Sequence, residues 1–69
     1  MILLFITNIM NETGRTRVMP VLNTLPGIRD WNVDMGDCDH VLRVEAVEDV
    51  TMTIISSLAA LGFCCRVML

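Results

Sequence analysis

Residues 28–46 read IRDWNVDMGDCDHVLRVEA, and this stretch decides the fold. In residues 28–35 the side chains alternate with a period of two, so that Trp31 and Val33 fall on one face and Asp30 and Asn32 on the other. The next four residues, Gly-Asp-Cys-Asp, are typical of a hairpin connection. Alternation resumes in residues 41–46. The stretch therefore predicts two antiparallel strands joined by a short loop.

Upstream of this hairpin the sequence predicts one strand and one helix. Residues 2–7 are a short β-rich run that is apolar on both faces, which is typical of a strand. In residues 16–25 the apolar positions recur at helical spacing, and Pro26 and Gly27 end the segment. Pro20 lies inside this helix, where it removes one backbone hydrogen bond and is expected to kink the helix at a cost of about 3 kcal/mol.

Downstream of the hairpin the sequence predicts a second helix and a last strand. Glu48 and Asp49 lie where the N-terminus of a helix favours negative charge, and Asp49 or Thr51 can cap it. Apolar residues then recur at helical spacing from residue 50 to residue 61, and Gly62 marks the end of the helix. Residues 63–69 form the last strand.

The order of these elements is strand, helix, strand, strand, helix, strand. It predicts a single α+β domain over residues 1–69, a ferredoxin-like βαββαβ sandwich with a four-stranded antiparallel sheet and both helices on one face. In this topology the last strand, the first and the third lie side by side in that order.

The composition excludes several classes of partner. Apolar residues make up 54% of the 69 residues and charged residues 19%, so the chain is expected to fold. The net charge is −3 and the five cationic residues are scattered arginines, which argues against nucleic acid as a partner. The longest uncharged stretch, residues 50–65, is too short for a membrane span. Three cysteines, two of them adjacent, do not make a disulfide framework, so we expect a cytoplasmic protein.

Several short stretches together point to a known family. They are residues 7–9 (TNI), 18–22 (VMPVL), 26–28 (PGI), 31–34 (WNVD), 41–45 (VLRVE) and 58–63 (LAALGF). With these stretches the chain resembles the heavy-metal-associated domain, the fold of small copper and other metal chaperones and of the N-terminal modules of metal-pumping ATPases. The resemblance covers nearly the whole chain and implies the same βαββαβ fold.

The resemblance also implies where a metal ion would bind. Members of the family hold a soft metal ion with two cysteines at C-x-x-C spacing, in the loop between the first strand and the first helix. Here that loop reads Asn-Glu-Thr-Gly, and with Pro20 as the anchor Asn11 and Gly14 occupy the two cysteine positions. Copper(I) and zinc sites of this kind depend on thiolates, which an amide and a hydrogen do not replace. We therefore expect a degenerate loop and no metal cofactor there.

The remaining ligand-type residues leave an alternative open. Cys38, Asp39 and His40 are expected at the same end of the sheet as Cys64, where relocated ligands could bind copper or zinc for trafficking. Strand order places the hairpin and the last strand toward opposite edges, roughly 10 Å or more apart. We therefore expect Cys64 to be an exposed thiol and Cys65 a small core residue.

No catalytic activity is expected. The chain has one histidine, His40, and a domain of this size offers little cavity for a nucleophile or a second acid. Backbone amides around Thr13 and Gly14, with Arg15, could bind an anion, so a ligand-sensing regulatory domain of the same topology is a further alternative. Asn11 or Thr13 acting as a helix cap explains the same residues without a ligand.

The side of the sheet away from the helices, its outer face, is where we expect the protein to bind a partner. Alternation places apolar side chains from three adjacent strands on this face, where relatives often carry lysine and glutamate. They are Leu4, Ile6, Val41, Cys64 and Met68. A chain of this size buries only about 60% of its unfolded surface, so a partner on this face would add stability. We expect a non-catalytic protein that associates through this patch, most simply as a homodimer.

Overall fold

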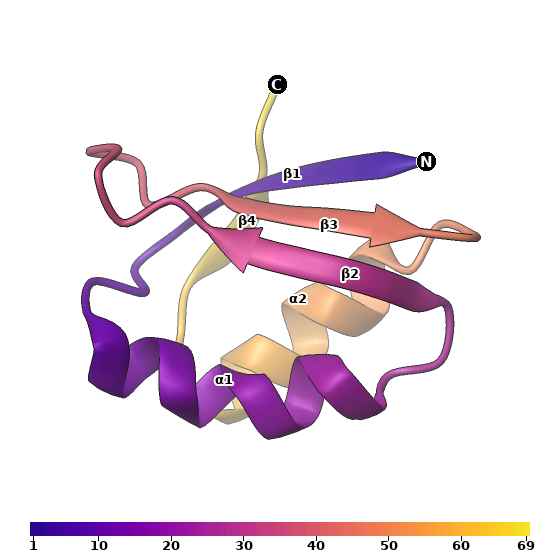
Figure 1. Ribbon diagram of the computed structural model, residues 1–69, viewed down its shortest axis with the longest axis horizontal. Helices are drawn as coiled ribbons and strands as arrows, with labels where there is room; N and C mark the ends of the chain where they lie inside the picture. Colours follow the sequence, from indigo (N-terminus) through magenta and orange to yellow (C-terminus); the bar gives the residue numbers. More distant parts are fainter.

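The computed structural model describes all 69 residues and contains four strands and two helices (Figure 1). In chain order they are β1 (Ile2–Thr7), α1 (Glu12–Thr24), β2 (Ile28–Val33), β3 (Leu42–Ala46), α2 (Thr51–Ala60) and β4 (Cys65–Val67). The strands form one antiparallel sheet in the order β2-β3-β1-β4. The predicted α+β fold and the predicted neighbours of β1 are confirmed.

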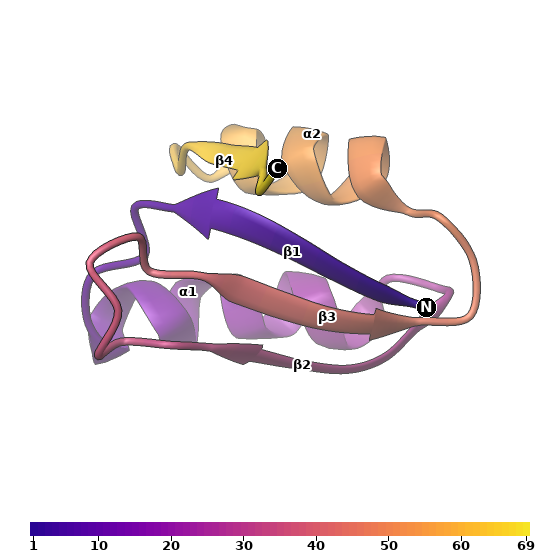
Figure 2. The ribbon, with the colours of Figure 1, turned by 90° about the horizontal axis from the view of Figure 1, so that it is seen from above.

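Both helices lie on one side of the sheet, below it in Figure 1. Figure 2 looks down on the opposite side, which no helix covers. We call this uncovered side the outer face. The chain therefore has two layers, and its core lies between the sheet and the helices.

The alternation in β1 and β3 decides which side chains enter this core. In β1 Phe5 is buried and its neighbour Leu4 is exposed. In β3 Leu42 and Val44 are buried, and Arg43 between them is exposed. From the helices, α1 and α2 each add two buried apolar residues, which are Val18, Leu22, Ile54 and Leu58. The inward and outward phases predicted for these strands are confirmed.

The first helix begins earlier than residue 16, where the sequence predicted it. It starts at Glu12 because Asn11 caps it: the Asn11 side-chain oxygen accepts a hydrogen bond of 2.9 Å from the Gly14 N–H. The helix continues through Pro20 to Thr24. The Thr24 hydroxyl donates to the Pro20 carbonyl at 2.8 Å, which satisfies an acceptor near the C-terminus of the helix.

Two strands are shorter than predicted: β2 was expected over residues 28–35 and β4 over residues 63–69. β2 ends at Val33, because the Asp34 carboxylate accepts from the Gly36 N–H and turns the chain into the hairpin loop. β4 is limited to Cys65–Val67, because the Phe63 N–H still donates to the Leu58 carbonyl at 3.0 Å as part of the end of α2.

The N-terminus of α2 also differs from the prediction. Val50 occupies the capping position and makes no side-chain capping bond. The Asp49 carboxylate instead accepts from the Thr51 N–H and from the Thr51 hydroxyl, which lowers the pKa of Asp49. At the other end Gly62 has a φ of +89°, a conformation that glycine adopts without steric cost, so the predicted stop is confirmed.

Candidate functional site

In the heavy-metal-associated family a metal ion binds between the first strand and the first helix. In this chain the residues there, Asn11 and Gly14, already make structural contacts. The Asn11 side-chain oxygen already accepts the bond from the Gly14 N–H. Gly14 is buried, and a Cβ at that position would lie 3.4 Å from the Phe63 ring and 3.5 Å from Ile9. Neither residue offers a free donor for a soft cation, so the residues present do not fit the metal of that family.

A shallow hollow lies at the start of α1, where the sequence left a small-anion site as an alternative. Asn11, Thr13, Gly14 and Arg17 are among its lining residues. Arg17 donates to the Leu61 carbonyl at 2.8 Å and its guanidinium lies 5.0 Å from the centre of the Phe63 ring. Arg15 packs in the same manner on Trp31, at 5.2 Å. Both arginines therefore serve packing between elements.

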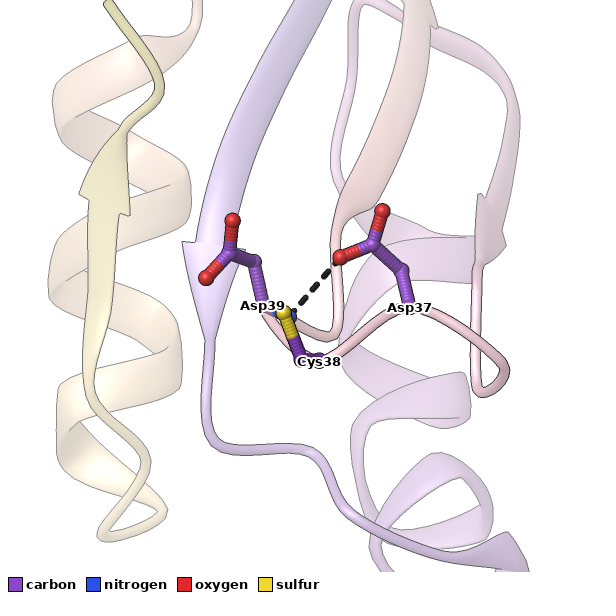
Figure 3. A group of neighbouring side chains, drawn as sticks. All are labelled: Asp37, Cys38 and Asp39. Carbon is purple, nitrogen blue, oxygen red and sulfur yellow. Dashed lines mark hydrogen bonds between the residues drawn. The ribbon is translucent and has the colours of Figure 1, made fainter.

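The hairpin loop brings three ligand-type side chains together, as Figure 3 shows. The ligand atoms of Asp37, Cys38 and Asp39 all lie within 4.8 Å of one another. The Asp37 carboxylate also accepts a bond of 2.8 Å from the Asp39 N–H, a local turn that by itself orders this loop. Sequence reasoning named Cys38 and Asp39 but missed Asp37, which the two-residue spacing of the aspartates around Cys38 could have indicated.

The other relocated ligands do not join this group. Cys64 and His40 belong to no group of three ligating side chains. His40 has a φ of +45°, its N–H donates to the Asp37 carbonyl, and its carbonyl accepts from the Thr7 hydroxyl at 2.6 Å. These bonds tie the loop to the end of β1, while the buried Nδ1 of His40 has no hydrogen-bond partner. The structure therefore does not assemble Cys64, Cys38 and His40 into one site.

The two adjacent cysteines have different environments. Cys64 is exposed, and its N–H is held by the Asn8 side chain at 2.9 Å. Cys65 is partly buried and packs against the core, and burial raises the pKa of its thiol to about 11. The expected contrast between an exposed Cys64 and a packed Cys65 is confirmed.

The outer face of the sheet is organised in rows across the strands. In one row Asp30, Glu45 and Ile2 lie opposite one another. In the next row Asn32, Arg43 and Leu4 are paired, and the Met68 N–H donates to the Leu4 carbonyl. In the third row Ile6 pairs with Arg66. Directly opposite residues share a face, so these side chains all belong to the outer face.

Four of the five predicted patch residues come together on this face. Leu4 is 38% exposed and Met68 39% exposed, and both line a shallow hollow with Val41 and Arg43. Ile6 lies next to Leu4 along β1. Cys64 lies farther along, beside Asn8 and just before β4 begins, so it borders the patch rather than filling it.

Sequence reasoning missed one member of the patch. Ile2 is 47% exposed and lies two residues before Leu4, on the same face of β1. The period-two alternation that identified Leu4 and Ile6 could have found Ile2 as well. Ile2, Leu4 and Ile6 thus form an apolar column along β1, and Met68 adjoins it from the β4 side. We call these four residues together with Val41 the outer patch.

No protein-family model matches the chain, and no curated protein matches it in sequence. Neither α1 nor α2 combines the length and apolar character that a membrane-crossing helix needs. The geometry of the molecule therefore carries the functional argument, and the uncovered outer face with its apolar column is its most distinctive surface.

Proposed function

We propose that this chain is a small non-catalytic domain of ferredoxin-like topology that acts by associating with another protein through the outer patch. A second copy of the chain is the simplest partner. The observation that carries the proposal is the run of apolar side chains along β1 on a sheet face that no helix covers, with Ile2, Leu4 and Met68 each more than a third exposed. Contiguous exposed apolar side chains on a small protein are typical of an interface.

The extent of the core supports this proposal. Apolar residues make up 54% of the chain, but the hydrophobic core contains only 11 residues. Much of the apolar side-chain surface is therefore still in contact with water. A partner on the outer face would bury part of it, at about 25 cal/mol for each Å² of apolar area removed from water.

The proposal is compatible with the resemblance to the heavy-metal-associated domain. We regard the chain as a relative of that fold in which the C-x-x-C loop has become a helix cap and a packing glycine, at Asn11 and Gly14. Association replaces metal transfer as its activity. An odd number of cysteines, two of them adjacent, fits a reducing, cytoplasmic compartment.

Sedimentation velocity with light scattering at rising protein concentration tests the proposal. The unmodified chain is expected to show a dimer at the upper end of the range, and the double variant Leu4→Lys, Ile6→Lys is expected to remain monomeric. Both side chains point away from the core, so circular dichroism should show an unchanged fold. A control is Met52→Lys, the same kind of substitution at one exposed apolar residue of α2. A wild-type chain that stays monomeric, or a dimer unaffected by the double variant, would contradict the proposal.

A rival function is metal binding with relocated ligands, and one observation favours it. The ligand atoms of Asp37, Cys38 and Asp39 converge within 4.8 Å, and a thiolate with two carboxylates suits a borderline ion such as Zn²⁺ (Figure 3). Calorimetric titration with Zn²⁺ separates the two functions. Stoichiometric binding that is lost on Cys38→Ser and kept on Cys64→Ser would favour the rival, whereas no saturable binding favours association alone.

A further inference from the structure

The outer face carries a charge pattern that is complementary to itself. Asp30 and Glu45 lie in one row across the strands, and Arg43 lies in the next row, opposite Leu4. Arg43 and Glu45 are two residues apart on β3 and point to the same side of the sheet, with Val44 between them buried in the core. Two carboxylates, of Asp30 and Glu45, therefore lie at one level along the strands, and the Arg43 guanidinium lies at the level beside it.

A two-fold axis that runs across the strands between these two rows exchanges them. Such an axis places the outer faces of two copies against each other with their β3 strands antiparallel. Each Arg43 then faces the partner's Glu45, and each Glu45 faces the partner's Arg43. On β1 the same operation lays Leu4 over the partner's Ile2. One symmetry operation thus matches opposite charges and joins apolar side chains at the same time.

We propose that the chain forms a face-to-face homodimer about this axis, held by the β1 side chains Ile2 and Leu4 and aligned by two reciprocal Arg43–Glu45 ion pairs. This inference rests on the proposed function, because it names the partner and the geometry of the association through the outer patch. It adds the residues that decide which orientation the two copies adopt.

The dimensions agree with this arrangement. Stacked sheets lie about 10 Å apart, a gap that an arginine and a glutamate reaching from opposite sides can bridge. The Cα atoms of the molecule extend over 27 × 24 × 17 Å, and the outer face spans the first and last of these dimensions (Figure 2). Because the axis lies near the N-terminal end of β1, the row that holds Ile6 and Arg66 projects beyond the partner, and only part of this face is buried. Such an interface falls below the total of about 1,000 Å² expected of a stable, specific complex, so the dimer should be weak and reversible.

A two-fold axis parallel to the strands gives a poorer match. Such an axis keeps each residue at its own level along the strands, so Arg43 meets only residues of its own row, none of which is acidic. If the axis runs over β1, it places β3 over the partner's β4, so that Arg43 faces Met68 and Val41 faces Arg66. In that arrangement neither arginine meets an acid, and Glu45 lies beyond the end of β4, where no basic side chain faces it. Because only the axis across the strands pairs Arg43 with Glu45, charge substitutions at these two residues discriminate between the orientations.

Sedimentation equilibrium on four chains tests the arrangement: the unmodified protein, Arg43→Glu, Glu45→Arg, and the double variant that carries both substitutions. Each single substitution places like charges opposite each other twice in the symmetric dimer, and should raise the dimer dissociation constant about tenfold or more. The double variant restores both pairs with their signs exchanged, and should return within about threefold of the unmodified protein.

Mixing the two single variants is the sharpest form of the test. Arg43→Glu leaves only acids at these two positions and Glu45→Arg leaves only arginines, so each variant repels itself while the mixture forms a heterodimer with both pairs satisfied. Arg66→Glu is the matched control, because it changes the charge of the same face equally at a residue that meets no partner acid. An effect of Arg66→Glu as large as that of Arg43→Glu, or no gain on mixing, overturns the arrangement. A chain that is monomeric throughout instead refutes the proposed association itself.

Discussion

Asn11 shows how one side chain fixes the start of a helix. Its side-chain oxygen accepts from the Gly14 N–H at 2.9 Å, and its own carbonyl accepts the first helical bond, from the Arg15 N–H at 3.0 Å. An N-cap of this kind contributes about 0.5 to 2 kcal/mol. We predict that Asn11→Ala lowers the free energy of unfolding by this amount, measured by urea denaturation.

The matched control keeps the acceptor. Asn11→Asp retains a side-chain oxygen and adds a negative charge at the positive end of the helix, so its stability should stay within about 0.5 kcal/mol of the unmodified chain at neutral pH. Equal losses for Ala and Asp would show that the Asn11 amide nitrogen, rather than the cap, is what matters.

The residue scale also shows what the sequence could and could not predict. Asn11 was one of two caps that its local chemistry suggested, together with Thr13, although the helix itself was predicted to begin only at residue 16. The packing of Gly14 against Phe63 did not follow, because those residues are 49 positions apart and only the docked arrangement of α1 and the turn before β4 brings them together. Contacts between distant segments depend on packing that no local pattern describes.

At the scale of elements, β4 contains a partly buried thiol, Cys65, whose titration links the stability of the fold to pH. Burial raises the pKa of Cys65 from its ordinary value of 9.0 to about 11. Between these two pH values the unfolded chain loses the thiol proton while the folded chain retains it, so the unfolded state gains stability. We predict that the free energy of unfolding falls as pH rises from 9 to 11 and that the contribution of Cys65 levels off above 11.

The composition leaves few other groups that titrate between pH 9 and 11. The chain has no tyrosine and its five cationic residues are all arginines, so apart from the cysteines no side chain ordinarily titrates between pH 9 and 11. Urea midpoints over this range should decline for the unmodified chain and for Cys64→Ala, and much less for Cys65→Ala. An equal decline in both variants would place the effect outside Cys65.

The elements differ in how well local patterns predicted them. The strands around the hairpin were placed within two residues, because alternation reports directly on one buried and one exposed face. β4 was predicted as seven residues and has three. Its length depends on the register with β1 and on the way α2 ends at Gly62, and neither is encoded in the apolar character of residues 63–69.

At the scale of the whole molecule, a two-layer fold leaves one side of its sheet without cover. The order of elements was enough to predict two helices on one side, because each helix has only one apolar stripe to bury. The charge rows on the outer face did not follow from it, because they depend on the registers of β3 with β1 and with β2, including the irregularity between Ile28 and Asp30. The fold class could thus be predicted from the sequence, whereas the level of each charge along the outer face depends on the strand registers of the folded sheet.

The small core and the uncovered sheet together predict that stability depends on protein concentration. Only the folded chain can present the outer patch, so the proposed dimerisation would stabilise the native state by mass action. Above the dissociation constant, each tenfold rise in concentration should raise the thermal midpoint by about 3 to 5 °C for a domain of this size. The Leu4→Lys variant, in which a charge interrupts the apolar column, should melt at one temperature at every concentration. Calorimetry from about 10 μM to 1 mM, the range in which an interface of this area is expected to assemble, measures both slopes. A wild-type midpoint as flat as that of Leu4→Lys would mean that the outer patch stays in water and that the 11-residue core stabilises the fold unaided.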